Sequence, residues 1–408
     1  MRRGEMQNEE CRMLNGERTS GFCIQHSAFS ICAGFVQSFT MRPARIAWAC
    51  LFAVAIVFGL TDRSRAVNAR DARRALIRLM APATRPSSST RPAGVTFEAV
   101  DLPLKTEGAT GETAEWLKAY DVKPQRFSYT LEMVSDEETV RVYRLVYPSP
   151  FQSPWPENNR VPAELYLPKK ADGPLPAAIV LDILDGSAVI PRGLARGLAE
   201  QGVAALYMPQ ACYGERRPAD NAHFQLFMRD PNAAITNVRQ TVMDVRRGKA
   251  VLAARPEVDP QRIAITGVSL GGIMAALAAG VDGGFYRVVP ILSGGDLAAI
   301  TFHARETRPV RSALEAKGLT EADAERLMAP IDPLHFASRI DPRTCLMINA
   351  ARDEVIPKVT TEALFRAIGS PQILWTPLGH YSSALYLPNI RQRTIEFIKG
   401  QKVEKLDW

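Results

Sequence analysis

The feature that most constrains the fold of this chain is a serine between two glycines, at the junction of two unlike segments. In RIAITGVSLGGIMAALAAG, residues 262–280, Ser269 stands between Gly267 and Gly271. The apolar run before the serine is typical of a buried parallel strand, and the alanine-rich run after it is typical of a helix that ends near Gly280. A strand, a sharp turn and a helix form the context in which a serine is displayed as a nucleophile. The glycines fit, because a side chain two residues on either side would collide with the neighbouring strand or helix.

Short apolar runs recur through the second half of the chain, and helix-length segments separate most of them. The runs cover residues 177–184, 203–209, 262–268, 286–292, 344–350 and 372–378, and the helical segments include residues 191–201, 237–254, 270–279 and 360–368. This alternation predicts an α/β fold with a mostly parallel central sheet and helices on both faces. Upstream, residues 127–147 alternate apolar and polar side chains around an acidic turn and predict an antiparallel hairpin, with a further strand at residues 161–168.

Three polar residues follow predicted strands in the order serine, aspartate, histidine. Asp353 comes just after the run that ends at residue 350, and His380 comes just after the run that ends at residue 378. A serine hydroxyl is a poor nucleophile at neutral pH, so it needs a base to take its proton and an acid to orient that base. Because functional groups of such sheets gather at the carboxyl ends of the strands, we expect Ser269, Asp353 and His380 to meet there.

The acid has two competitors in the sequence. Glu354 adjoins Asp353, and Asp296 follows the preceding strand. Adjacent side chains leave a strand-end turn in different directions, so only one of residues 353 and 354 can reach the histidine, and the short loop favours Asp353. The base has few competitors, since the remaining histidines are His26, His223, His303 and His335.

The region from about residue 161 to residue 399 resembles the α/β-hydrolase superfamily, and is most similar to its dienelactone hydrolase-like and acetyl xylan esterase-like branches. VDPQRIAITGVSLGG, INAARDEVIP and LGHYSS carry the likeness in the family's order. The resemblance implies the α/β-hydrolase fold, antiparallel lead-in strands and a small lid insertion. It also implies that Ser269 is the nucleophile, His380 the general base and Asp353 the orienting acid, with no cofactor and no metal.

The same resemblance implies two backbone N–H donors for the oxyanion, one from Leu270 and one from Leu184 or Ile183. Many relatives have a His-Gly pair in that loop, whereas this chain reads LDILDGS, with Asp182 at the position of the histidine. We expect Asp182 and Asp185 to have structural roles and to bind loop amides.

Two irregular segments, residues 209–232 and 293–333, are expected to form the pocket walls, and the second could act as a small lid. The first contains Arg216 and Arg217. These arginines would either receive an acidic group of the substrate or be a solvated surface pair.

Composition excludes several other classes of protein. The 408 residues are 46% apolar and 23% charged, as in soluble globular proteins, and the net charge of +7 is concentrated in the first 95 residues, which hold 14 arginines and no lysine. The remainder is nearly neutral and predicts no nucleic-acid partner.

Only Cys212 and Cys345 lie outside the N-terminal extension, so neither a disulfide framework nor a zinc spacing is present. No G-x-G-x-x-G occurs, and Gly248-Lys249 lacks the upstream glycine of a P-loop.

The N-terminal extension has the parts of a secretory signal. A basic stretch, residues 41–45, precedes the apolar residues 46–60 and a small-residue site that ends at residue 69. We therefore divide the chain into a leader (1–69), a basic helix and Pro/Ser/Thr linker (70–94) and a catalytic domain (95–408). Because residues 1–40 precede the signal, our hypothesis is that translation starts at Met41. Two alternatives stay open: membrane association through an uncleaved anchor at residues 46–60, and a cytoplasmic protein with a disordered basic leader.

Together these features predict an exported serine hydrolase, periplasmic or extracellular, that cleaves a small-molecule or carbohydrate ester through an acyl-enzyme. A peptidase of the prolyl-oligopeptidase type shares the motifs, although the roughly 80 residues between the linker and the parallel sheet are too few for a propeller domain. A non-catalytic binding protein that retains the fold is the alternative from another class. The sequence indicates neither the substrate's acyl group nor an oligomeric state.

Overall fold

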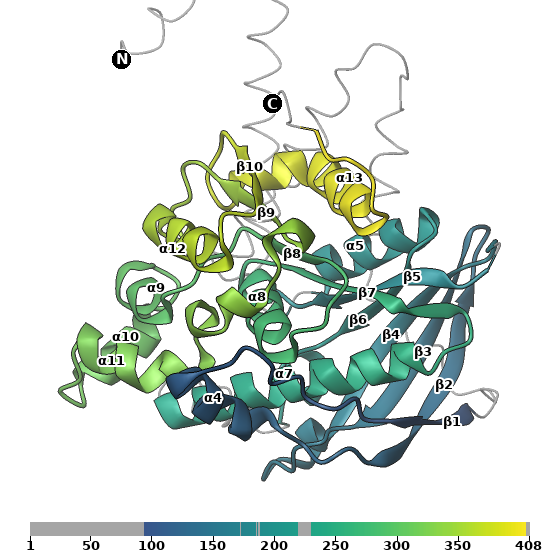
Figure 1. Ribbon diagram of the computed structural model, residues 1–408, viewed down its shortest axis with the longest axis horizontal. Coiled ribbons are helices and arrows are strands. Elements are labelled where there is room, and N and C mark those ends of the chain that lie inside the picture. The colour runs from purple at the N-terminus through teal and green to yellow at the C-terminus, as the bar shows by residue number, and fades with distance from the viewer. Residues whose placement is uncertain (1–93, 172, 185, 187, 219–229, 405–408) are drawn as a thin grey trace, which may run out of the picture. The chain divides into compact units, whose positions relative to one another are not determined.

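A single sheet organises the structure. The computed structural model describes residues 94–404 except 172, 185, 187 and 219–229. The strands in this part of the chain are Val95–Val100 (β1), Arg126–Asp136 (β2), Val140–Pro148 (β3), Arg160–Pro168 (β4), Leu175–Leu181 (β5), Ala204–Met208 (β6), Val258–Val268 (β7), Val288–Ile291 (β8), Leu346–Ala350 (β9) and Gln372–Thr376 (β10). Their order across the sheet is β1-β2-β3-β4-β6-β5-β7-β8-β9-β10 (Figure 1).

The sheet has two halves with different strand directions. From β1 to β6 each neighbouring pair is antiparallel, and β6, β5, β7, β8, β9 and β10 run parallel to one another. The predicted hairpin is therefore β2 and β3, and the predicted extra strand is β4. The edge strand β1, which pairs with β2, was not predicted from the sequence.

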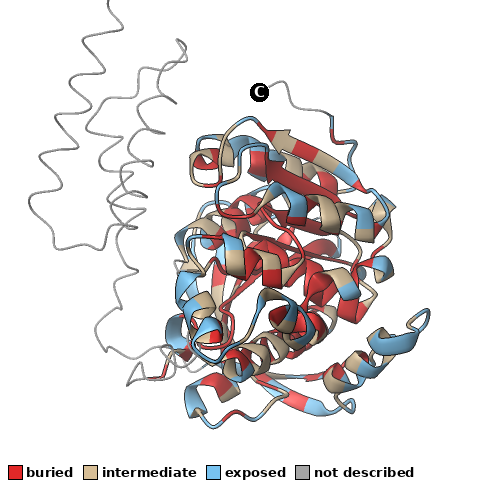
Figure 2. Cartoon of the chain, turned by 90° about the vertical axis from the view of Figure 1, so that its left-hand side faces the viewer, coloured by how far each residue is buried: buried red, intermediate tan, exposed pale blue. Residues whose placement is uncertain are grey.

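Helices cover both faces of the parallel half. Every residue of β5 is buried, and its alternate side chains belong to two separate apolar layers, as expected for a strand covered on both sides. One layer contains Val189–Glu200 (α5) and Leu387–Ile398 (α13), and the other contains Pro231–Ala253 (α7), Leu270–Asp282 (α8) and Lys358–Ile368 (α12). Figure 2 shows the buried strands between helices whose outer faces are exposed. The predicted fold class is confirmed.

The helix after Ser269 is longer than predicted. α8 passes through Gly280 and ends at Gly283, whose left-handed φ of 66° closes the last turn. Gly280 is needed for space, since a Cβ there would lie 2.6 Å from the carbonyl oxygen of Phe336. The helix end predicted near Gly280 was therefore too early in the chain.

The insertion between β8 and β9 is mostly helical, not irregular as predicted. It contains Leu297–His303 (α9), Arg308–Glu315 (α10) and Glu321–Met328 (α11). Before the sheet, Gly111–Leu117 (α4) lies in the connection from β1 to β2. None of the helices within the described residues is long and apolar enough to cross a membrane. The expected leader, residues 1–69, and the expected linker up to residue 93 lie outside the described residues.

Candidate active site

Ser269 occupies a strained turn between β7 and α8. Its backbone has φ 57° and ψ −120°, a conformation that costs a residue with a side chain about 1–3 kcal/mol. The Ser269 N–H donates to the carbonyl of Ile291 at the end of β8, at 2.9 Å, which fixes the turn against the neighbouring strand. Such strain persists only where the surrounding structure imposes it, and it is typical of functional sites.

The two glycines around the serine allow close contact of three backbone segments. A Cβ on Gly267 would lie 2.4 Å from the carbonyl carbon and oxygen of Gly271. A Cβ on Gly271 would lie 2.6 Å from the carbonyl oxygen of Asp182 and 2.8 Å from that of Leu181. Neither clash is tolerable, so the steric role predicted for both glycines is confirmed.

His380 links the serine to an aspartate. Its Nε2 lies 3.0 Å from the Oγ of Ser269, and its Nδ1 lies 2.9 and 3.0 Å from the two carboxylate oxygens of Asp353. The side chains of His380 and Asp353 are only 5% and 1% exposed. The structure thus brings together three residues that are far apart in the sequence, each from the end of a different parallel strand.

The carboxylate of Asp353 is held by its own loop. One of its oxygens accepts hydrogen bonds from the backbone N–H groups of Val355, at 2.9 Å, and Ile356, at 2.7 Å. These bonds orient the carboxylate toward the imidazole. The carboxylate also sets the imidazole tautomer. Because it accepts a hydrogen bond from Nδ1–H, Nε2 carries no proton and can accept one from the serine.

The two competing carboxylates have other partners. Glu354 accepts the backbone N–H of His380 at 2.8 Å and does not bind the ring. Asp296 is the N-cap of α9, with φ 59° and ψ 69°, and accepts the N–H of Ala299 at 3.0 Å. Of the three acidic residues considered from the sequence, Asp353 is the one whose carboxylate contacts the imidazole.

The residues expected to donate to an oxyanion lie on two segments that meet at the serine turn. Leu270 is the first residue of α8, where backbone N–H groups have no partner within the helix. Leu184 is in the turn after β5, which Gly186 closes by donating its N–H to the carbonyl of Ile183 at 3.0 Å. Because Gly271 lies close to the end of β5, this turn lies next to the start of α8.

Asp182 binds a neighbouring strand, a contact that was not predicted from the sequence. It is fully buried, and its carboxylate accepts a 2.8 Å hydrogen bond from the hydroxyl of Tyr207 on β6. Burial, and next the carboxylate of Asp182, raise the pKa of Tyr207 well above its usual range, so the hydroxyl remains a donor. The carbonyl of Asp182 accepts from the side chain of Gln210 at 2.7 Å. Asp185 lies outside the described residues.

Neither interpretation of Arg216 from the sequence was right. Its side chain is fully buried and forms an ion pair of 2.6 Å with Asp244 of α7, whose side chain is also fully buried. It also donates to the carbonyl of Asn158 at 2.8 Å. Arg216 is therefore neither solvated nor available to a substrate. Arg217 is only partly exposed, and much of the wall segment that follows it, residues 219–229, lies outside the described residues.

A contact between the insertion and the histidine loop was not predicted from the sequence. The hydroxyl of Tyr381 donates to Glu306, between α9 and α10, at 2.5 Å. Burial and this carboxylate raise the pKa of Tyr381 above its usual range, which keeps the hydroxyl protonated. A small apolar cluster, which includes Ile273 of α8, Ile300 of α9 and Ile356, packs in the same place. Seventy-five residues separate the two ends of this hydrogen bond, and no local pattern marks either one.

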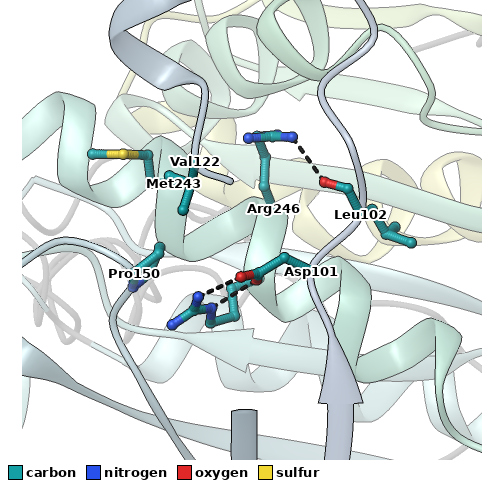
Figure 3. Close-up of a pocket in the computed structure, with 7 residues that line it drawn as sticks. Asp101, Leu102, Val122, Pro150, Met243 and Arg246 are labelled. Atoms are coloured by element: carbon teal, nitrogen blue, oxygen red, sulfur yellow. Dashed lines mark hydrogen bonds and ion pairs between the residues drawn. The ribbon is translucent and has the colours of Figure 1, made fainter. Parts of the chain in front are cut away.

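Two hollows elsewhere in the structure do not contain the serine. A cavity of about 10 Å³ beside α7 is lined by residues that include Asp101, Leu102 and Arg246, and Figure 3 shows Arg246 bonded to the Leu102 carbonyl. It has room for about one water molecule and none for a substrate. A groove of about 720 Å³ lies over β2 and β3. Among the described residues, no cluster of histidine, cysteine and carboxylate side chains has the composition of a metal site.

Two family models match parts of the chain. Residues 108–304 match the family model described as alpha/beta hydrolase domain containing 18, and residues 236–374 match the prolyl oligopeptidase family. No curated protein matches the sequence significantly.

Solved structures of similar fold include esterases. An acetyl xylan esterase from Paenibacillus sp. R4 has a TM-score of 0.59 and 22% identity, over 74% of this chain and 97% of that one. Acetyl xylan esterase 1 from Thermoanaerobacterium sp. JW/SL YS485 has a TM-score of 0.49 and 19% identity, over 68% and 92%. At such identities the likeness concerns the fold alone.

The sheet order, the strained serine turn and the strand-end histidine and aspartate define the architecture of an α/β hydrolase. Together with the two family matches, they show that the chain belongs to the α/β-hydrolase superfamily.

Proposed function

We propose that the protein is a serine hydrolase that cleaves a carboxylic ester through an acyl-enzyme. The observation that supports this proposal most is the chain of hydrogen bonds from Asp353 through His380 to Ser269. It ends on a serine in a strained turn, which is the arrangement that nucleophilic catalysis by a hydroxyl group requires.

The first half of the proposed reaction forms the acyl-enzyme. Nε2 of His380 takes the hydroxyl proton as Oγ of Ser269 attacks the ester carbonyl, and Asp353 stabilises the resulting imidazolium. The negative charge moves to the carbonyl oxygen, where the N–H of Leu270 and that of Leu184 or Ile183 are the proposed donors. The tetrahedral intermediate then expels the alcohol, which receives the proton from His380.

The second half regenerates the enzyme. His380 removes a proton from water, which attacks the acyl carbon, and the second tetrahedral intermediate releases the carboxylic acid and returns the proton to Ser269. This cycle uses only groups of the protein, the ester and water.

A small-molecule or carbohydrate ester is the substrate class we favour. The similarity of the fold to acetyl xylan esterases supports an ester of a short acyl group, whereas the match of residues 236–374 to the prolyl oligopeptidase family supports a peptide amide as the second candidate. A binding protein that retains the fold remains the non-catalytic alternative, but such a protein has no physical need for all three polar residues of the site.

Turnover of a matched set of substrates tests this proposal. p-Nitrophenyl esters of increasing acyl length, an acetylated sugar and a peptide amide should be compared on the wild-type protein and on Ser269→Ala. We expect hydrolysis of at least one ester, with little cleavage of the amide, and loss of both in the variant. Cleavage of the amide in preference to every ester would replace the esterase by a peptidase, and no turnover of any substrate would favour the binding protein.

We further propose that the protein is exported, because a basic stretch, an apolar segment and a small-residue site follow one another between residues 41 and 69. N-terminal sequencing of the native protein should find a start near Arg70, in a fraction outside the cytoplasm or at a membrane. Full-length protein in the soluble cytoplasm would contradict export, and a mature start upstream of Met41 would contradict the proposed initiation site.

A further inference from the structure

The position of the catalytic imidazole depends on the backbone of the loop that carries it. His380 lies between the end of β10 and a 3₁₀ turn at Ser382–Tyr386, in a segment without regular secondary structure of its own. A displacement of about 1 Å in a reacting group can lower a rate by about a hundredfold. The Ser269 and Asp353 contacts of the ring therefore require that the main chain at residue 380 be held in place.

The carboxylate of Glu354 contacts this main chain directly. One oxygen accepts the N–H of His380 at 2.8 Å, and the other lies 3.4 Å from the N–H of Tyr381. Asp353, the preceding residue, contacts the ring of the same histidine. Two consecutive side chains of one loop thus hold the ring and the backbone of His380.

The glycine before the histidine fits this contact. A Cβ on Gly379 would lie 2.1 Å from the carboxylate oxygen of Glu354 and 3.0 Å from the carbonyl oxygen of Arg352. Gly379 does not have a positive φ, so its lack of a side chain serves space and not conformation. Any other residue at this position would displace the carboxylate.

Other hydrogen bonds of the loop do not replace this one. The N–H of Gly379 donates to the hydroxyl of Ser382 at 2.9 Å, and the carbonyl of Gly379 accepts from the backbone and side chain of Ser383. These bonds hold the loop on either side of the histidine, and Glu354 holds the histidine itself.

We propose that Glu354 is a positioning residue for the proposed hydrolase reaction, on which this inference rests: its carboxylate fixes the backbone of His380 so that the imidazole meets Ser269 and Asp353 together. The role requires a hydrogen-bond acceptor at this place, and the negative charge is secondary because Glu354 is exposed to solvent, which screens it.

The test compares Glu354→Ala, Glu354→Gln and Gly379→Ala in the full-length protein, on the p-nitrophenyl ester that the wild type hydrolyses fastest. We expect Glu354→Ala to lower kcat about 10- to 100-fold with KM within about threefold, because substrate binding does not need an oriented base. Glu354→Gln keeps an acceptor oxygen and should retain kcat within about tenfold. Gly379→Ala should lower kcat by a similar factor. The double variant Glu354→Ala/Gly379→Ala should lower kcat little further, since both changes remove the same contact.

A matched control is Glu362→Ala on α12. It removes another exposed carboxylate, which pairs with Lys358, and it should leave kcat unchanged. Normal kcat in Glu354→Ala, an effect confined to KM, or a Glu354→Gln variant as slow as Glu354→Ala would overturn the positioning role.

If Glu354→Ala does not fold, Gly379→Ala decides: wild-type kcat in that variant overturns the role, and a selective loss of kcat supports it. A wild type that turns over no ester would overturn the proposed function and this role with it, whereas hydrolysis through Ser269 that is insensitive to Glu354 would overturn the role alone.

Discussion

Two regions of the molecule, the helix α7 and the ends of the parallel strands, use buried charge in different ways. On α7, Asp244 forms an ion pair with Arg216 in which both side chains are fully buried, and Arg247 pairs with Asp101, with side chains 5% and 9% exposed. At the strand ends, Asp353 and the histidine it contacts are buried to a similar extent. Burial of charged side chains therefore does not by itself mark an active site in this protein.

The difference lies in where each set of contacts ends. The pairs on α7 are closed, because the remaining hydrogen bonds of the arginines go to backbone carbonyls such as those of Asn158 and Pro148. The contacts of Asp353 continue through the imidazole to the hydroxyl of Ser269. A closed pair can stabilise the packing of an element, whereas an open chain that ends on a nucleophile can transfer a proton.

The largest effect on turnover short of removing the nucleophile is expected from Asp353→Asn. The amide cannot stabilise the imidazolium and favours the wrong tautomer, so kcat should fall about a thousandfold or more. Steady-state kinetics on an ester measures this effect, with circular dichroism as a check of folding. Near-normal turnover in a folded variant would show that the acid is elsewhere.

Changes in the closed pairs should lower stability and leave turnover intact, the reverse of what we expect for Asp353→Asn. Arg216→Met leaves the carboxylate of Asp244 buried without its ion-pair partner, so we expect the free energy of unfolding to fall by roughly 3–5 kcal/mol, with kcat retained well below the melting temperature. Urea denaturation measures the loss. Arg343→Met is the control, since Arg343 is 88% exposed in its pair with Asp341 and should give no measurable change. A stable Arg216→Met variant with low kcat would assign this arginine to the site.

The smallest effect is expected from Asp296→Asn, the same chemical change at the end of the neighbouring strand. Asparagine tolerates the left-handed backbone conformation and caps helices as well as aspartate does, so kcat should stay within about threefold of the wild type. Side-by-side kinetics with Asp353→Asn measures the contrast. An inactive Asp296→Asn beside an active Asp353→Asn would place the acid one strand earlier.

Local pattern was sufficient for the architecture and for the positions of the main candidate site residues. The change from alternating runs to short apolar runs separates β2, β3 and β4 from the parallel strands, because strands buried on both faces have no polar side. Ser269, Asp353 and His380 could be found because each follows such a run directly, and strand ends converge in a parallel sheet.

Contacts between distant segments away from the strand ends could not be predicted. The charged sequence around Arg216 is typical of a solvated loop, and only the packing of residue 216 against α7 and against Asn158, 58 residues away, removes it from water. Asp182 meets Tyr207 for the same reason. The end of α8 was missed because Gly280 and Gly283 both suit a helix end, and the need for a glycine at 280 comes from Phe336, which approaches it from a remote segment.

The central claim is that Ser269 is a nucleophile activated by His380, and covalent labelling tests it most directly. A fluorophosphonate probe should label the wild-type protein at one site, which peptide mapping by mass spectrometry should identify as Ser269. Ser269→Ala should abolish both labelling and ester turnover while the protein remains folded. Labelling that survives in Ser269→Ala, or a folded wild type that the probe does not modify, would contradict the account.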